Sequence, residues 1–523
     1  MPTLMRSTAL ALALVAFAST ADAQTPKRGG TLTFAVTSEA PTFDCHATTT
    51  YAAIHVLSPH YSLLVKIDGN NYPNIVPALA ESWTISPDGL TYTFKLRAGV
   101  TFHDGSAFSS KDIKATFDRI RKPPAGIVSV RKAAFEDITA IDTPDATTVV
   151  FKLKAPDTQF LGLLALPFNC VYSAAQIEKD QNYPAKNIMG TGPFVHIEHV
   201  AGSHFVGKRY EKYFEPGKPY IDGFKAVLMK ASALVPAFQG GQVQAEFRSI
   251  NPGERDQLVK ALGDKIVIQE SPWLCKTHLL FNVKEKPFDN VKVRQALQMS
   301  IDRWGGSEAL GKISIVKPVG GPIRPGDDYA LSPDELAKLP GFGRDIEKSR
   351  AEARKILEEA GLKDLKFRLI NRNVTHPFTP TGVYVVDQFR RIGVTAEHVQ
   401  LDVSQQKKAL FGGEFQVAVD AFCVDNDDPR PLMLQFLSKS RSPRNTTHGE
   451  NPEIDKLYDS LKGKDKAAQK AIVAEMQRQI ITSAFDVPVL WYSRIVAHSS
   501  ALKGWKISPT HFANQDHSGV WLE

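Results

Sequence analysis

A short acidic run and one flanked arginine are the side chains of this sequence best suited to hold a charged ligand. Residues 425–428 read Asp-Asn-Asp-Asp. A carboxylate such as Asp425, in a loop at a domain cleft, can pair with a ligand ammonium group, whereas composition alone favours a solvated turn or a helix cap. Arg372 stands between two asparagines, and its planar guanidinium matches a ligand carboxylate, although a lone arginine is more often a surface residue.

Motifs of metal sites and of common enzymes are missing. The acidic run lacks the glycine and the distal glutamate of an EF-hand, and Pro429 follows it directly. The sequence contains no Gly-x-Ser-x-Gly elbow, no His-Glu-x-x-His and no Walker loop. We therefore predict a protein that is not an enzyme, with no catalytic residue, metal or cofactor. Two alternatives stay open: an exported hydrolase of peptides or esters, and a chaperone-like binder of unfolded segments.

Length and composition indicate a globular protein of several domains. The chain has 523 residues, of which 43% are hydrophobic and 23% charged, and this length favours two or three domains. The net charge is +7, but the 63 basic residues are scattered among 56 acidic ones. Because nucleic acid binding needs clustered positive charge, no nucleic acid partner is expected.

The first residues have the pattern of a secretory signal peptide. Arg6 precedes an apolar run over residues 9–18, and Ala21-Asp22-Ala23 places small residues where a signal peptidase reads them. The run is too short to span a bilayer, which needs roughly 20 apolar residues. We predict cleavage after Ala23 and a mature, exported protein that begins at Gln24.

Four cysteines are spread along the chain, at Cys45, Cys170, Cys275 and Cys423. They lie too far apart for a zinc ribbon or a thioredoxin-type pair. An exported chain meets an oxidising compartment, so one or two disulfides are expected, with three possible full pairings.

Hydrophobic periodicity predicts both strands and helices. Residues 29–36 and 83–96 alternate as strands, the second segment forming a hairpin around Ser-Pro-Asp-Gly. Residues 291–301 and 349–360 have helical spacing, with capping residues before the first and Gly361 after the second. Residues 319–326 are too rich in Gly and Pro for either element. No fixed repeat occurs, which points to α/β lobes.

Several segments, taken in order, resemble the extracellular solute-binding protein family 5, the peptide, dipeptide and nickel receptors of ABC importers. The resemblance covers nearly the whole mature chain. Its most specific block starts with Pro-Ala-Leu-Ala-Glu-Ser-Trp. The matching segments are residues 77–83, 88–97, 102–105, 190–194, 281–282, 293–297, 301–303 and 451–457.

The resemblance implies an α/β fold with a two-lobed periplasmic-binding-protein clamshell and an additional β-rich domain. A small-molecule or peptide ligand, with a peptide-like solute expected, would lie between the lobes of a periplasmic monomer that serves the membrane subunits of an ABC importer. The crossings between lobes, near Asn282 and Ile495, would form the hinge. The implied parts are a signal peptide over 1–23, lobe I over 24–68, 188–283 and 497–523, the additional domain over 69–187, and lobe II over 284–496.

The resemblance also implies site residues. Phe422-Cys423-Val424-Asp425 is similar to a Trp-Cys-Ala-Asp segment whose aspartate binds the peptide amino terminus in relatives, so Asp425 takes that role and Phe422 forms an aromatic wall. Ser38 and Glu39 fall where relatives have a ligand-lining loop. In some relatives the matching cysteine pairs with one located as Cys275 is, which implies a Cys275–Cys423 disulfide.

Overall fold

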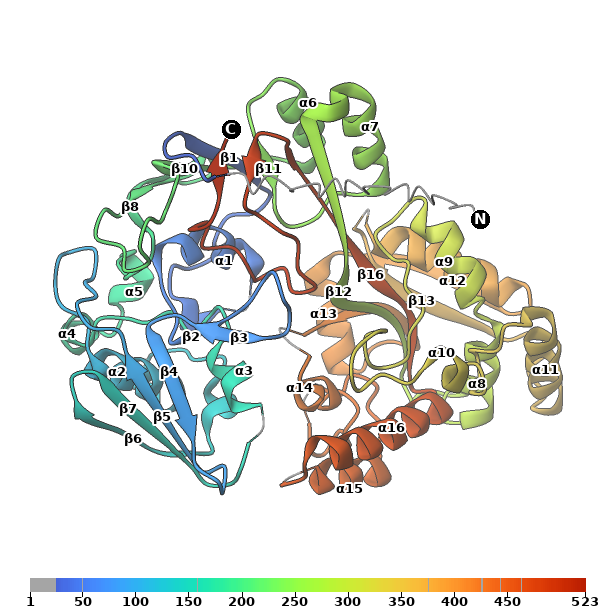
Figure 1. The fold of residues 1–523 in the computed structure, drawn as a ribbon. Coiled ribbons are helices and arrows are strands. Elements are labelled where there is room, and N and C mark those ends of the chain that lie inside the picture. The colour runs from blue at the N-terminus through green and yellow to red at the C-terminus, as the bar shows by residue number, and fades with distance from the viewer. Residues whose placement is uncertain are drawn as a thin grey trace, which may run out of the picture.

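A single ten-stranded sheet runs through most of the molecule, with two long strands, β12 and β16, at its centre (Figure 1). The computed structural model describes residues 25–523 except 49, 158, 375, 425, 426, 443 and 462. The predicted cleavage site after Ala23 and the candidate residue Asp425 therefore lie outside the described residues. The strand order is β14-β13-β15-β12-β16-β11-β1-β10-β9-β8. The strands of this sheet are β1 Thr31–Val36, β8 Phe194–Val200, β9 His204–Arg209, β10 Gly223–Leu228, β11 Ala245–Glu246, β12 Ile266–Phe281, β13 Lys366–Arg372, β14 Thr395–Leu401, β15 Val417–Cys423 and β16 Asp486–Ser499.

The two long strands connect two lobes. We call the half of the sheet with β11, β1, β10, β9 and β8 lobe I, and the half with β15, β13 and β14 lobe II. β12 and β16 pair with each other along their length, but β16 contacts β11 near Ala497, whereas β12 contacts β15 from Cys275 onward. The antiparallel register between the long strands shifts between Pro272 and Lys276, and again beside Pro488.

A proline explains each shift, because it has no backbone N–H to donate to the ladder. On β12, pairing with β15 begins at Cys275, next to the Pro272–Lys276 irregularity. Asn282, where we expect a crossing between lobes, directly follows this strand. On β16 the irregular pairing faces Trp491 and Ser493, close to the expected Ile495.

The additional domain is a separate antiparallel sheet of order β4-β5-β7-β6, seen in blue and teal at the lower left of Figure 1. The Gly89 backbone has a positive φ of 69°, and its N–H donates to the Ser86 carbonyl, so the predicted hairpin turn is confirmed. Phe94, Phe117 and Phe151 belong to its buried core. The remaining strands are β2 Val65–Ile67, β3 Ile75–Pro77, β4 Ala80–Ile85, β5 Thr91–Leu96, β6 Ile138–Asp145, β7 Thr148–Leu153, β17 Leu502–Lys503 and β18 Trp521–Leu522.

Helices cover the sheets, and most of them belong to lobe II. None of the described helices is long and apolar enough to cross a membrane. Lobe I has α1 Tyr51–Leu57, α6 Leu234–Gln239 and α7 Pro252–Leu262; the additional domain and its border have α2 Ser110–Arg121, α3 Phe160–Leu164, α4 Ala174–Lys179 and α5 Tyr183–Lys186; lobe II has α8 Val291–Ser300, α9 Arg303–Gly311, α10 Pro333–Leu336, α11 Ile346–Glu359, α12 Phe378–Arg390, α13 Val403–Gly412, α14 Pro429–Met433, α15 Pro452–Ser460 and α16 Lys466–Ser483.

Both predicted helices are confirmed. α8 begins after Asn290, whose side chain accepts a hydrogen bond from the Lys292 amide. α11 begins three residues before the predicted 349, because Asp345 accepts from the Lys348 amide and caps an earlier turn. The Gly- and Pro-rich segment 319–326 forms neither helix nor strand, as predicted.

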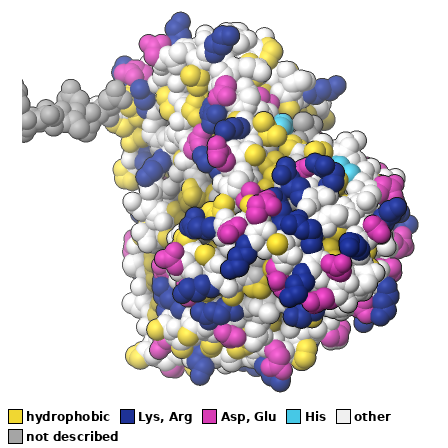
Figure 2. All heavy atoms as spheres, turned by 90° about the vertical axis from the view of Figure 1, so that its right-hand side faces the viewer, with side chains coloured by type: hydrophobic (Ala, Val, Ile, Leu, Met, Phe, Trp, Pro, Cys, Tyr) yellow, Lys and Arg dark blue, Asp and Glu magenta, His cyan; other side chains and the backbone are white. Residues whose placement is uncertain are grey.

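Charges of both signs are interspersed on the outer face of lobe II, which Figure 2 shows. Helix α11 has ion pairs within itself, such as Arg350 with Glu347 at 2.6 Å. On α12, Asp387 pairs with both Arg390 and Arg391 at 2.7 Å. Such i,i+3 and i,i+4 pairs follow from the helical repeat and add a few tenths of a kcal/mol each, about 0.2 to 0.5.

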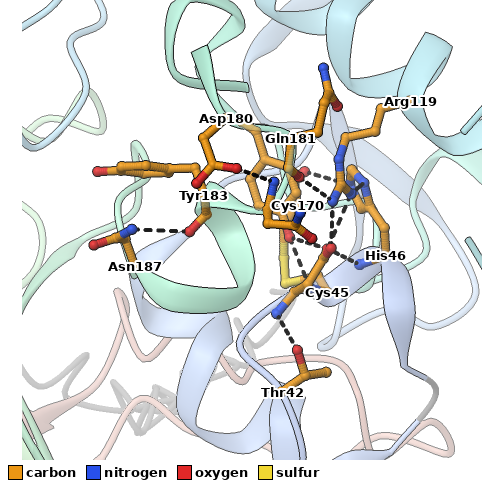
Figure 3. Close-up of polar contacts among 12 residues, drawn as sticks. Thr42, Cys45, His46, Arg119, Cys170, Asp180, Gln181, Tyr183 and Asn187 are labelled. Atoms are coloured by element: carbon orange, nitrogen blue, oxygen red, sulfur yellow. Dashed lines mark hydrogen bonds and ion pairs between the residues drawn. A yellow bond between two sulfur atoms is a disulfide. The ribbon is translucent and has the colours of Figure 1, made fainter. Parts of the chain in front are cut away.

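A disulfide and a buried ion pair join the start of lobe I to the region beside the additional domain (Figure 3). Cys45 is bonded to Cys170, and Arg119 of α2 donates to Asp44 at 2.6 Å with both side chains buried. Arg119 also donates to Nδ1 of His46, so this nitrogen has no proton and Nε2–H donates to the Cys170 carbonyl. Burial and neighbouring cations lower the pKa of His46 to about 3. The histidine is therefore neutral and structural.

Candidate functional site

A cavity of about 1230 Å³ lies between lobe I and lobe II. β1 runs parallel to β10 and β11, and β13 runs parallel to β14 and β15. Loops after the carboxyl ends of β1, β11, β13 and β15 line the cavity, which is where ligands bind in α/β sheets with parallel strands. The lining includes Thr37, Ser38, Glu39, Glu246, Arg248 and Ser249 from lobe I, Arg372, Val374, Phe378, Phe422, Val424 and Arg444 from lobe II, Leu163 from α3, and Leu166, which follows α3.

Aromatic side chains form much of the cavity wall. Trp273, in the irregular part of β12, packs edge-on against Tyr492 and His511 with ring centroids 5.7 and 5.2 Å apart, and its Nε1–H donates to Nδ1 of His511 at 2.7 Å. Tyr51 and Phe422 also line the cavity, and Phe422 is half-buried. The wall thus offers aromatic and apolar faces beside polar and charged side chains, a combination that small-molecule sites use to fix the orientation of a ligand.

Arg372 lines the cavity, but protein groups already bind its guanidinium. Nε donates to Gln406 at 2.8 Å, Nη2 donates to the buried Asp420, and the guanidinium lies 4.4 Å from the ring centre of Phe378. Burial acts to raise the pKa of Asp420, yet the charges of Lys407 and Arg372 hold it below its usual value. Arg372 is therefore an ion-paired part of the cavity wall.

Ser38 and Glu39 follow β1 and also line the cavity. The Glu39 carboxylate binds within lobe I: Oε1 lies 3.0 Å from Nε2 of His199, and Oε2 accepts from the Gly202 amide at 2.9 Å. Ser38 is exposed to the cavity. Both residues thus line the cavity, where the resemblance placed a ligand-lining loop. The Glu39 carboxylate, however, already binds His199 and the Gly202 amide.

The described part of the acidic run has structural partners. Asp427 accepts from Arg324 at 2.8 Å, and Asp428 caps α14 by accepting from the Arg430 amide at 2.9 Å. The helix cap considered from composition thus exists at Asp428. Among the residues that the structure describes, no group of three or more His, Cys, Asp or Glu could hold a metal ion.

The cysteines form two disulfides, Cys45–Cys170 and Cys275–Cys423. This is one of the three possible pairings and includes the pair expected from the resemblance. Cys275 and Cys423 face each other in the β12–β15 register with their Cα atoms 4.1 Å apart, and both line the cavity. The bond therefore fixes the edge of the wall beside Phe422.

Sequence reasoning missed four charged residues of the cavity: Glu246, Arg248, Glu254 and Arg444. Glu246 ends β11, and burial raises the pKa of its carboxyl to about 7. The loop after it is held by the buried Arg494 of β16, which donates to the carbonyls of Phe247, Arg248 and Ser508. Because β11 has two residues and no motif surrounds Arg248, no local signal marks these positions.

The chain is similar to known binding proteins. A model of the bacterial extracellular solute-binding proteins, family 5 (middle), matches residues 74–444. The glutathione-binding protein GsiB of Escherichia coli O1:K1 is 29% identical over 454 residues, covering 84% of this chain and 85% of that protein, and GsiB of Salmonella typhimurium gives the same figures.

Solved structures share the fold. The periplasmic binding protein DppA of Helicobacter pylori, in complex with the peptide STSA, superposes with a TM-score of 0.79 at 24% identity, covering 95% of this chain and 99% of that one. The substrate-binding protein CtaP of Listeria monocytogenes gives 0.83 at 23% identity, covering 95% and 100%. AgaA of A. tumefaciens R10, with agropinic acid, gives 0.78 at 23%, covering 94% and 99%.

Proposed function

Because the chain belongs to the bacterial extracellular solute-binding proteins of family 5, we propose that it is a periplasmic receptor that encloses a peptide-like solute between its lobes and delivers it to the membrane subunits of an ABC importer. The observation that carries this proposal is the cavity of about 1230 Å³ lined by the carboxyl-end loops of both lobes. A site shared by two lobes on a hinge binds its ligand best when closed, so occupancy changes the shape of the protein.

The lining and the named relatives support a peptide-like ligand. The cavity is larger than many drug-sized sites, which span about 300 to 1000 Å³, so a short peptide fits its volume. Its aromatic wall suits apolar side chains, and its charged groups suit the two ends of a zwitterion. Glutathione and the peptide STSA are ligands named for similar proteins.

We retain the expected division of the chain as part of this proposal. Lobe I comprises 24–68, 188–283 and 497–523, the additional domain 69–187, and lobe II 284–496. The core clusters support three bodies, since one buried cluster gathers Phe94 and Phe151, another Phe34 and Phe224, and a third Val293 and Val487. The end of β12, with Leu279, packs in this third cluster although the division counts it in lobe I. The register shift at Pro272–Lys276 is the place on β12 where we expect the hinge to turn.

Asp425 is the residue that we propose to bind the ligand ammonium group. Replacing it with Ala removes a charge-assisted hydrogen bond, and the expected loss is about 2 to 5 kcal/mol, or roughly 30-fold to several thousandfold in affinity. Asp425→Asn recovers part of this, because the amide keeps an acceptor without the charge. Calorimetry with the bound ligand measures both variants, and unchanged binding in Asp425→Ala would remove this role.

Identifying the natural ligand tests the proposal directly. Protein purified from a periplasmic extract is denatured, and the released small molecules are identified by mass spectrometry; we expect a peptide-like compound that rebinds one-to-one in calorimetry. Cleavage of that compound on incubation with the protein would support the exported hydrolase instead.

A further inference from the structure

Two arginines line the cavity from opposite lobes, and neither forms an ion pair with a carboxylate of the described residues. Arg248 follows β11 in lobe I, and Arg444 follows α14 in lobe II. We propose that they bind two anionic groups of the ligand, so that the cleft selects acidic peptide-like solutes. This inference deepens the proposed function and rests on it, because it concerns the same cleft.

The guanidinium of Arg248 is exposed to the cavity, and no described carboxylate lies within ion-pair distance of it. Its own backbone N–H donates to Oε1 of Glu246 at 3.0 Å, so this carboxyl contacts the backbone rather than the side chain. The guanidinium stands 5.8 Å from the ring centre of Tyr51, another lining residue. Arg494 fixes the loop through its carbonyls, so the group is presented by a rigid support.

Arg444 is also exposed in the cavity. Its guanidinium makes one long contact, in which Nη1 donates to the Pro431 carbonyl at 3.3 Å, and no described carboxylate pairs with it. Most of the donor fork is thus free to bind a planar carboxylate in the two-point geometry that arginine favours.

None of the described acidic residues of the cavity forms an ion pair with these two arginines. Glu39 binds His199 and the Gly202 amide, and Glu254 accepts from the Asn251 amide in a helix-capping box. Burial raises the pKa of Glu246 to about 7, so its carboxyl is partly protonated at neutral pH. When the cleft closes, unpaired guanidinium groups lose water, and an anionic ligand is the partner that compensates them.

The ligand chemistry follows from this pattern. If Asp425 takes the ammonium group of a peptide, the terminal carboxylate satisfies one arginine and leaves the other unpaired. An additional carboxylate on a side chain completes the match. A short peptide with an acidic residue therefore fits the described charges better than a neutral one of equal size.

The test uses two matched peptides and two matched small molecules. Calorimetry compares Ala-Glu-Ala with Ala-Gln-Ala, and glutarate with neutral glutaramide, on the ligand-free full protein, on Arg248→Gln and on Arg444→Gln. Arg368→Gln is the control, since that arginine is 61% exposed on β13, outside the cavity lining. Unfolding temperatures verify that the variants are folded.

We expect the unmodified protein and Arg368→Gln to bind Ala-Glu-Ala about tenfold or more tightly than Ala-Gln-Ala. The variant that lacks the arginine for the side-chain carboxylate should lose most of that preference, and the other cavity variant should bind both peptides more weakly. Equal binding of the two peptides, or a preference that persists in both cavity variants, overturns the proposal that Arg248 and Arg444 bind anionic groups of the ligand. The proposed receptor function is not affected by that result. If glutarate binds in an arginine-dependent manner while neither peptide binds, the peptide function fails and the anionic site stands. Failure of every probe to bind overturns both.

Discussion

Burial of the Glu246 carboxyl is the main reason that its pKa rises to about 7. The hydrogen bond that Oε1 accepts from the Arg248 amide acts to lower the pKa, and Oε2 has no partner among the described residues. The unfolded chain binds this proton with a pKa near 4.5. The folded state therefore binds the proton more tightly, and the stability that this provides is complete below pH 4.5 and is lost as the pH rises through 7.

Glu246→Gln should remove this pH dependence. The neutral amide keeps an acceptor for the Arg248 amide and avoids a buried charge. At pH 8 we therefore expect the unfolding free energy of the variant to exceed that of the unmodified protein by up to about 3 kcal/mol, and its unfolding temperature to be higher. At pH 4 we expect little difference. Calorimetric scans at both pH values measure it. Glu352→Gln, an exposed position on α11, is the control, and equal gains at pH 4 and pH 8 would contradict the explanation.

Single residues were predictable where a motif surrounds them. Phe422 and Cys423 were found through a short segment that resembles a family pattern, and both line the cavity. Arg248 was not found, because its position depends on pairing between β11 and β16, which are more than two hundred residues apart in the chain. Arg372 was found, but its ion pair with Asp420 was not, since spacing does not show which partner a side chain meets.

At the scale of elements, local signals were sufficient for the hairpin at Ser86 and for helices α8 and α11, where caps and turns act within a few residues. They were insufficient for β12, a 16-residue strand that contains Pro272. A proline argues against a central strand, and here it stands at a register shift instead. The tertiary context that allows it, pairing on both sides, is invisible in the local sequence.

The Cys275–Cys423 bond connects β12 to β15 at the end of their ladder, beside the cavity. Replacing both cysteines with Ser should lower the unfolding free energy of lobe II by about 2 to 4 kcal/mol, because the unfolded chain regains the freedom of a long loop. Ligand affinity should fall as well, since the wall at Phe422 loses its anchor. Calorimetric unfolding and ligand titration measure these effects.

The matching Cys45→Ser/Cys170→Ser variant separates the two outcomes. That bond lies in the cluster around Asp44 and Arg119, away from the cavity lining. Its loss should lower stability while ligand affinity stays within about twofold. Equal losses of affinity in the two double variants would show that neither disulfide acts locally on the site.

At the scale of the whole molecule, the additional domain contacts lobe II directly. Asp157, which follows β7, pairs with Arg430 of α14 at 2.6 Å, and the Asp157 carbonyl accepts from Tyr92 at 2.7 Å. Arg430 also pairs with Asp428 at 2.9 Å. Figure 1 shows this domain and the helices α14, α15 and α16 facing each other on the side away from β11. Opening at the proposed hinge would separate this contact.

Asp157→Asn should therefore favour the open form. The pair is partly exposed, so its contribution is up to about 1 kcal/mol, which corresponds to a loss of affinity of roughly five-fold at most. Small-angle X-ray scattering of the ligand-free variant should give a larger radius of gyration, and bound ligand should dissociate faster. Asp142→Asn, which breaks the Lys152 pair inside the additional domain, is the control. An unchanged radius and dissociation rate would show that the contact does not restrain the lobes.

The two disulfides also follow one another along the chain without interleaving: Cys45 pairs with Cys170, and both precede the Cys275–Cys423 pair. In a chain that crosses a membrane amino terminus first, the earlier two cysteines are together on the far side before Cys275 arrives. Oxidation in order of arrival then joins the native partners each time. Each of the two non-native pairings requires Cys45 and Cys170 to stay reduced until Cys275 and Cys423 have crossed the membrane. The order of the cysteines along the chain therefore favours correct oxidation without reshuffling.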